Sequence, residues 1–173
     1  MELDFLIVAS GLNCTPYVYK CYESILNQTY TNYNAILISD GSTDDTEKRL
    51  DTIKIGNVTT QHFKDNVGAC KRRYDAIKGS NATDETVILL LGLDDYLLPN
   101  ALEVIKEQYD NGKLMTYGNW IDQKGICLPP NFPLDFDEAT HTNRDYRKVK
   151  YRSTAPNTFK KRLYDNIPIN EFL

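Results

Sequence analysis

Short apolar runs alternate with amphipathic stretches along the first 121 residues of the chain. Runs rich in Val, Ile and Leu predict strands buried on both faces, and apolar residues at three- and four-residue spacing predict helices between them. The predicted strands cover residues 3–9, 34–39, 57–63, 86–91 and 113–121. The predicted helices cover residues 16–27, 66–79 and 99–112. A further helix begins within "DGSTDDTEKRL", capped by Ser42 or Thr43, with Asp44, Asp45 and Glu47 in its first turn.

Strand and helix alternate four times, an order that predicts parallel βαβ units and therefore a doubly wound α/β sheet. After residue 122 the pattern weakens, because "KGICLPPNFPLDFDEATHTNRDYRKVKYR" is rich in proline and polar residues. This part predicts long loops or a small hairpin, followed by a short helix over residues 154–168. A chain of 173 residues has the length of one domain, so we expect a single domain over residues 1–173.

The formal net charge of −4 disfavours sequence-independent binding to nucleic acid. The longest apolar runs have the length of strands and are too short to span a bilayer. The N-terminus "MELDFLIVAS" lacks the basic region and cleavage pattern of a signal peptide. Four cysteines lie far apart without a CxxC pair, which indicates reduced thiols rather than a zinc site. We therefore expect a cytoplasmic protein with no transmembrane segment and no nucleic-acid partner.

Polar side chains follow three of the predicted strands. Ser10 follows the first strand, Asp40 the second, and Asp94 and Asp95 the fourth. Ligands of open α/β sheets bind beyond the carboxyl ends of the strands, so we expect these side chains to meet at one edge. Clustered carboxylates repel one another and need a cation, and oxygen ligands favour Mg²⁺ or Mn²⁺. Such an ion shares its remaining positions with phosphates, which predicts a nucleotide or nucleotide-sugar site.

Several charged residues near these strand ends have more than one interpretation. Asp95 either belongs to the cation site or caps the helix that follows it. Asp44 and Asp45 are expected to be solvated residues at a helix start, where the helix dipole favours them. The basic run Lys71–Arg73 is either a solvated helix face or supplies a contact to a phosphate or a base.

Four ordered segments resemble the motifs of a known family. The segments are "FLIVASGLN", "ESILNQTYTNYNAILISDGSTDDT", "NVGACKRRY" and "LLGLDDYLLPNAL", and they span residues 5–102. In order and spacing they resemble the GT-A-fold glycosyltransferases of the large inverting family 2. The resemblance implies a GT-A, Rossmann-like α/β fold with a mixed, mostly parallel sheet and helices on both faces. It also implies a nucleotide-sugar-binding half at residues 1–102 and an acceptor-side half at residues 103–173.

The resemblance assigns five residues to the donor nucleotide. Asp40 corresponds to the second acid of the family's "DDG" turn and would accept a hydrogen bond from the nucleobase. Ser10 and Leu12 would line the base pocket. Asn66 and Arg73 fall on family positions beside the nucleotide and its diphosphate. The implied donor is a UDP-sugar.

The resemblance also implies a metal ion. Asp94 falls on the last acid of the family's DXD motif, which ligates Mn²⁺ or Mg²⁺ beneath the donor diphosphate, and Asp95 follows it. Gly92 stands where the first DXD acid normally lies, so we expect weaker metal binding that the diphosphate itself largely supports. Two further departures are Ser39, in place of the first acid of "DDG", and Leu12, in place of a tyrosine that commonly stacks on the base.

The implied activity is inverting transfer of a sugar, of the hexosyltransferase type, to a hydroxyl of a glycan or glycoprotein. A carboxylate must deprotonate that hydroxyl, and in the family it lies about where this chain ends. Either the acceptor-side half is truncated at its C-terminus, or the base is one of four acids: Asp122, Asp135, Asp137 and Glu138. Two alternatives stay open. One is a nucleotidyltransferase, although "ASGLNCTP" is a poor phosphate loop, and the other is a sugar-nucleotide-binding module without efficient turnover.

Overall fold

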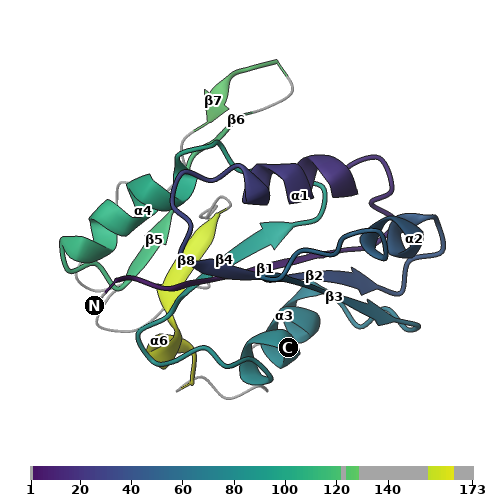
Figure 1. The fold of residues 1–173 in the computed structure, drawn as a ribbon, viewed down its shortest axis with the longest axis horizontal. Coiled ribbons are helices and arrows are strands. Elements are labelled where there is room, and N and C mark those ends of the chain that lie inside the picture. Colours follow the sequence, from purple (N-terminus) through teal and green to yellow (C-terminus); the bar gives the residue numbers. More distant parts are fainter. Residues whose placement is uncertain (1, 122–123, 129–155, 166–173) are drawn as a thin grey trace, which may run out of the picture. The chain divides into compact units, whose positions relative to one another are not determined.

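A computed structural model of the chain describes residues 2–121, 124–128 and 156–165. Its main feature is a six-stranded sheet with the strand order β3-β2-β1-β4-β8-β5 (Figure 1). The strands are β1 (Phe5–Gly11), β2 (Tyr33–Asp40), β3 (Val58–Phe63), β4 (Val87–Gly92), β5 (Met115–Tyr117) and β8 (Asn157–Lys160). The first four correspond to predicted strands. β1, β2 and β4 are apolar runs buried along most of their length, whereas β3 is mostly polar and only its Val58 is buried.

The sheet is mixed and mostly parallel. β1 pairs in parallel with β2 and with β4, and β2 pairs in parallel with β3. The chain at the end of β8 runs against β4, since the N–H of Lys161 donates to Thr86 O and the next N–H, of Arg162, donates to Asp84 O. The predicted α/β class and sheet type are therefore confirmed.

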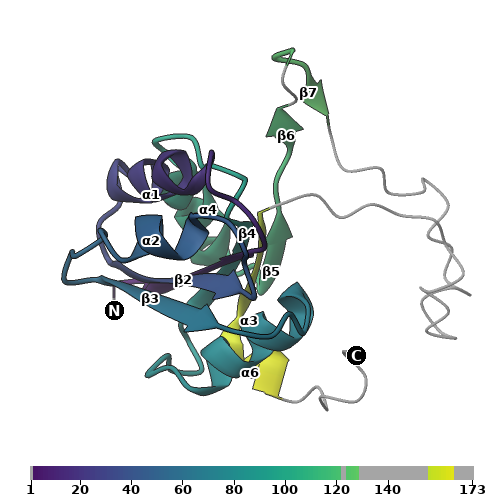
Figure 2. The same cartoon turned by 90° about the vertical axis from the view of Figure 1, so that its right-hand side faces the viewer.

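Helices cover both faces of this sheet (Figures 1 and 2). They are α1 (Val18–Leu26), α2 (Thr46–Leu50), α3 (Ala69–Lys78), α4 (Ala101–Asp110) and α6 (Lys161–Asp165). Alternate residues of β1 point to opposite faces. Ile7 packs in a core with side chains of α1, α2 and α4, whereas Val8 packs in a second core with side chains of α3 and α6.

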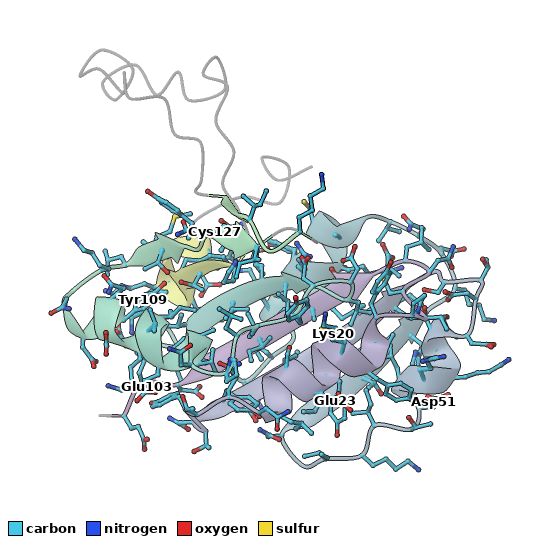
Figure 3. All side chains as sticks on the ribbon, turned by 90° about the horizontal axis from the view of Figure 1, so that it is seen from above. Lys20, Glu23, Asp51, Glu103, Tyr109 and Cys127 are labelled. Carbon is cyan, nitrogen blue, oxygen red and sulfur yellow. The ribbon has the colours of Figure 1, made fainter. Side chains whose placement is uncertain are left out.

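The outer faces of the helices are polar, as their spacing predicts. Lys20 and Glu23 of α1 and Glu103 of α4 are exposed, while Val18 and Ile25 of α1 are fully buried (Figure 3). No helix within the described ranges is both long and apolar enough to cross a membrane.

The chain divides into two compact units, residues 1–116 with 158–173 and residues 117–157. The described part of the second unit contains a short antiparallel pair, β6 (Trp120–Ile121) and β7 (Cys127–Leu128). The single strand predicted over residues 113–121 is therefore two short strands, β5 and β6.

Three local predictions are wrong. Within the range 154–168, predicted as a helix, the described residues form the strand Asn157–Lys160 and the five-residue helix Lys161–Asp165. The strand forms because this part bonds to the sheet, for example from Lys160 N–H to Leu114 O at 3.0 Å. Neither Ser42 nor Thr43 caps α2, whose N-cap residue is Asp45. Asp95 does not cap the helix that follows it, since α4 begins at Ala101 with Asn100 as its N-cap residue.

Candidate functional site

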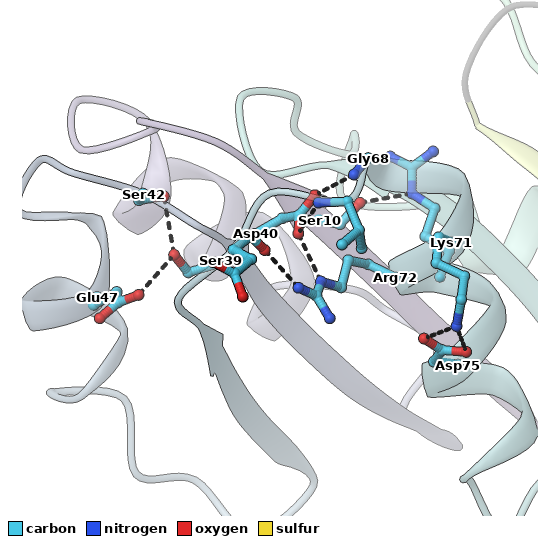
Figure 4. A network of polar contacts seen from close by, with 12 residues as sticks. Ser10, Ser39, Asp40, Ser42, Glu47, Gly68, Lys71, Arg72 and Asp75 are labelled. Atoms are coloured by element: carbon cyan, nitrogen blue, oxygen red, sulfur yellow. Dashed lines mark hydrogen bonds and ion pairs between the residues drawn. The ribbon is translucent and has the colours of Figure 1, made fainter.

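The carboxyl ends of β2, β1 and β4 are neighbours, because these strands are adjacent and parallel. Ser10 of β1 lies level with Gly92 of β4. Ser10 and Asp40 point to the face of the sheet covered by α3, whose side chains contact both (Figure 4). Asp94 and Asp95 directly follow Gly92. The structure thus brings the strand-end residues expected from the sequence to one edge of the sheet, and their roles stay predictions.

Asp40 is a buried carboxylate, only 3% exposed. Its Oδ1 accepts hydrogen bonds from Arg72 Nε at 2.6 Å and from the Val67 N–H at 3.2 Å. Its Oδ2 accepts the Gly68 N–H at 2.8 Å. Ionised groups in a water-poor site form strong hydrogen bonds, so this end of the edge is firmly ordered by the chain's own donors.

Arg73, the next residue of α3, lies one strand further along the edge. Its Nε donates to Ser10 Oγ at 2.8 Å, and its Nη2 donates to Leu91 O at 2.8 Å. Burial lowers the pKa of this guanidinium, and the charges of Asp95 and Asp94 act in the opposite direction. A cationic side chain therefore lies between the Asp40 end and the Asp94 end.

The basic run divides among three environments. Lys71 pairs with Asp75 on the helix surface, so for this residue the solvated-face interpretation is confirmed (Figure 4). Arg72 and Arg73 are instead directed into the strand ends. Successive residues of a helix differ by about 100° in direction, so three neighbours cannot share one surface.

Asp94 and Asp95 are exposed and lie over Gly92. A Cβ atom on Gly92 would lie 2.4 Å from Asp94 Oδ1 and 2.9 Å from Asp95 Oδ2. Burial raises the pKa of Asp95, and the neighbouring charge of Asp94 raises it further. The glycine that departs from the DXD pattern thus provides the space in which two carboxylates come together.

The residues present fit a divalent cation. Two carboxylates close enough to repel one another are stabilised by a positive charge, and both are accessible. Within the part of the chain that the structure describes, no group of three or more His, Cys, Asp or Glu side chains gathers. A site with only two carboxylates suits Mg²⁺ or Mn²⁺, which commonly keep positions for water and substrate phosphates.

Cys14 and Cys21 are buried near the strand ends of the site. Burial raises the pKa of Cys14 to about 11 and that of Cys21 to about 12, and nearby carboxylates add to both effects. The Cys21 Sγ lies 3.6 Å from Gly92 O. Thiols with such high pKa values are poor nucleophiles, so these two side chains act as packing groups.

Asp44 joins the loops that follow β1 and β2. Its carboxylate accepts the N–H of Thr15 at 3.1 Å and the N–H of Thr46 at 3.0 Å. Burial raises its pKa, but the hydrogen bonds from Thr15 and Thr46 outweigh that effect and hold the pKa well below its usual range. Asp44 and Asp45 are both exposed at the start of α2, as expected. Asp45 pairs with Lys48 at the surface, whereas Asp44 in addition links two loops, which the sequence did not predict.

Asn13 forms the second link between these loops. Its N–H donates to Ser42 Oγ at 3.0 Å, and its Oδ1 accepts the Thr43 N–H at 2.8 Å. Asn13 has a φ of 54°, a left-handed conformation that asparagine tolerates better than most residues. The adjoining Leu12, a predicted base-pocket residue, is 47% exposed.

Asn66 lies against the turn that follows Asp40. Gly41 in that turn has a φ of 77°, and a Cβ there would lie only 2.6 Å from the backbone nitrogen of Asn66. Glycine is therefore required at position 41 for both its conformation and the close approach. The loop that carries Asn66 and Val67 closes over the end of β2. The base candidates Asp122, Asp135, Asp137 and Glu138 lie outside the described residues.

Comparisons of this chain with known proteins identify glycosyltransferases. The family model described as Glycosyl transferase family 2 matches residues 7–170. The chain is 37% identical over 131 residues to the UDP-Glc:alpha-D-GlcNAc-diphosphoundecaprenol beta-1,3-glucosyltransferase WfaP of Escherichia coli. That alignment covers 74% of this chain and 50% of WfaP.

Solved structures share the fold. S. aureus TarS 1-349 superposes with a TM-score of 0.71 at 16% identity, over 95% of this chain and 49% of TarS. The mannosyltransferase PcManGT from Pyrobaculum calidifontis, solved with GDP-Man and Mn²⁺, superposes with a TM-score of 0.65 at 12% identity, over 95% and 46% of the two chains. These likenesses confirm the expected GT-A fold. The chain spans about half the length of these relatives.

Proposed function

The chain belongs to glycosyl transferase family 2, and on that premise we propose that it transfers a sugar from a nucleotide-diphosphate sugar to a hydroxyl acceptor. The observation that carries the proposal is the order of groups along one sheet edge: a buried acceptor at Asp40, a cation at Arg73, and a carboxylate pair at Asp94 and Asp95. A nucleotide-diphosphate sugar presents a base, a diphosphate and the cation that accompanies it in this same order.

The proposed donor carries uridine diphosphate. An ionised carboxylate only accepts hydrogen bonds, so Asp40 favours a base with a ring N–H, such as uracil, over cytosine. Ser10 and Leu12 would line the base pocket, and Asn66 would lie beside the nucleotide. The name of WfaP specifies UDP-Glc, and TarS has been solved with UDP-GlcNAc, which supports this choice.

We assign the diphosphate to Arg73 and to the cation end of the edge. Asp94 and Asp95 would hold Mn²⁺ or Mg²⁺. A bound ion of this kind supplies positive charge next to the departing nucleoside diphosphate. Arg73 is fixed by Ser10 Oγ and Leu91 O, so it is oriented before any donor arrives. A pre-oriented cation needs no rearrangement when negative charge develops.

The acceptor side of the proposal rests on the family. Inversion requires a carboxylate that takes the proton of the acceptor hydroxyl as it attacks, and the candidates are Asp122, Asp135, Asp137 and Glu138, unless the base lies in further chain. We propose a glycan or glycoprotein as the acceptor. The cytoplasmic location and the two-half division of the chain stay predictions.

One alternative has a specific observation in its favour. Gly92 replaces the first DXD acid, which favours a sugar-nucleotide-binding module without efficient turnover. Membership of the glycosyltransferase family disfavours the nucleotidyltransferase alternative.

A panel assay separates these functions. UDP-Glc, UDP-GlcNAc and GDP-Man are each titrated into the protein by calorimetry, with Mn²⁺ and with EDTA, and nucleoside diphosphate release is measured in parallel. A glycosyltransferase binds at least one donor in a metal-dependent manner and releases its nucleoside diphosphate. Binding without release supports the binding module, and failure to bind any of the three contradicts the proposal.

A further inference from the structure

We propose that Arg72 is a positioning residue that sets the base preference of the donor site by acting on Asp40. The inference rests on the proposed function, in which Asp40 accepts a hydrogen bond from the base. Arg72 itself is not proposed to touch the donor. Three features of the Arg72 side chain give it this role: the segments that it joins, the oxygen of Asp40 that it occupies, and its charge.

Arg72 joins three segments that are distant in sequence. Its Nε bonds to Asp40 at the end of β2, and its Nη2 donates to Asp65 O in the loop after β3. Its guanidinium lies 3.7 Å from the centre of the Phe63 ring, at the end of β3. A planar guanidinium suits all three contacts at once, since it donates in its plane and stacks on its face.

These contacts leave one orientation for the Asp40 carboxylate. Oδ1 accepts from Arg72 and from the Val67 N–H, and Oδ2 accepts from the Gly68 N–H (Figure 4). A carboxylate has about four acceptor positions, so roughly one stays open, and it is on Oδ2. Arg72 thereby determines which oxygen, and which direction, is left for a base.

The same side chain holds the loop that carries Asn66. The loop begins near Asp65, whose carbonyl accepts a hydrogen bond from the Arg72 guanidinium. It ends at Gly68, whose carbonyl accepts the backbone N–H of Arg72 at 3.2 Å, a bond that does not depend on the side chain. Loss of the guanidinium would therefore release Asp40 and the Asp65 end of the loop together.

Arg72 also supplies the positive charge that faces the buried carboxylate of Asp40. The Asp40 and Arg72 side chains are 4% and 11% exposed, so each desolvated charge has the other as its partner. Removal of the guanidinium takes away both this charge partner and the donor on Oδ1 of Asp40. The acceptor direction left open on Oδ2 is then no longer fixed, so the site distinguishes less well between the ring N–H of uracil, which donates, and the ring nitrogen of cytosine, which accepts.

Lys71 provides a matched control. It is the preceding residue of the same helix and carries the same charge, but it pairs with Asp75 at the surface, with side chains 36% and 42% exposed. Arg72→Gln and Lys71→Gln change the net charge equally. Circular dichroism first establishes that both variants are folded. Calorimetry with Mn²⁺ then gives the dissociation constants of UDP and CDP, and their ratio is the base preference.

We expect Arg72→Gln to reduce the preference for UDP over CDP by roughly tenfold, and Lys71→Gln to leave it unchanged. Asp40→Asn, measured in parallel, tests the proposed function. If the wild type has no preference, or Asp40→Asn retains it, the base role of Asp40 is wrong. If Asp40→Asn loses the preference and folded Arg72→Gln retains it, only the inference about Arg72 is wrong.

The double variant covers the case in which Arg72→Gln does not fold. Asp40→Asn with Arg72→Gln has no buried charge, and it is compared with Asp40→Asn alone. If Arg72 acts through Asp40, the second change does not alter UDP affinity further. An additional loss of UDP affinity overturns the inference, because it shows that Arg72 acts by another route.

Discussion

The two ends of the candidate site differ in how the chain treats its negative charge. At the end of β2, Asp40 is buried and its oxygens are occupied by a guanidinium and two backbone N–H groups. Beyond β4, Asp94 and Asp95 are exposed and crowd together over Gly92. The carboxylate of the first end, which we call the completed end, already has donors and a positive charge supplied by the chain. The second, the cation end, is suited to a metal ion that binds from solution. We therefore expect the Asp40 end to keep its geometry with or without a donor, and the positions of Asp94 and Asp95 to depend on whether a cation is bound.

Removing Arg72 tests the completed end and has the largest expected effect. Arg72→Ala leaves a buried carboxylate without its ion pair, so we expect it to lower the free energy of unfolding by about 3–5 kcal/mol. Lys71→Ala, which breaks only a surface pair, should cost less than about 1 kcal/mol. Urea unfolding followed by circular dichroism measures both. Similar losses for the two variants would contradict the distinction between them.

Neutralising the acids tests the cation end. In the presence of Mn²⁺, Asp94→Asn should weaken UDP binding by at least roughly 10–100-fold. That is the usual effect of losing a group that merely orients a metal ligand, and a ligand itself should matter at least as much. Asp95→Asn should cost less, because Asp94 occupies the DXD position. Both acids are exposed, so unfolding free energies should change little. Equal UDP affinity of the wild type with Mn²⁺ and with EDTA would show that no metal is used.

Filling the space over Gly92 tests whether the cation end depends on the two carboxylates lying close together. A methyl group in Gly92→Ala would displace the ends of both carboxylates, and we expect up to about tenfold weaker Mn²⁺ binding. Gly56→Ala is the control, because no atom lies within 4 Å of a Cβ there. Manganese titration by calorimetry makes the measurement. Unchanged Mn²⁺ affinity in Gly92→Ala would mean that the convergence of the two carboxylates is unimportant.

The smallest effect is expected at Asp44, which links two loops near the completed end. Asp44→Asn weakens hydrogen bonds to an exposed group, so we expect a loss of about 0.5–1 kcal/mol at pH 7 after allowing for solvent screening. The pKa of Asp44 is lowered in the folded chain. Its contribution is therefore fully present above about pH 4 and disappears as the pH falls through the lowered pKa.

Unfolding free energies at pH 7 and at acidic pH check this prediction. The wild type and Asp44→Asn should differ at pH 7 and converge in acid. Asp45→Asn is the control, because it removes the neighbouring carboxylate, whose ion pair with Lys48 lies at the surface of the same helix start. A difference that persists unchanged at acidic pH would exclude ionisation of Asp44 as its source.

The order of strands and helices through β4, the placement of Asp40 and Asp94 at strand ends, and the family could all be predicted from the amino-acid sequence. These features are local: a buried strand needs only a run of apolar residues, and a strand end is where that run stops. The same rules failed over residues 154–168, because the strand there depends on pairing with a distant part of the sheet.

The partner of each basic residue of α3 depends on the tertiary structure. Arg72 and Asp40 are 32 residues apart, and Arg73 and Ser10 are 63 apart, so nothing in the local pattern distinguishes these arginines from Lys71. The direction of each side chain follows from how α3 is set against the sheet. Asp44 is a similar case, since its partner Thr15 lies on another loop. Local periodicity specifies the elements, but contacts between distant residues exist only after packing has fixed where each element lies.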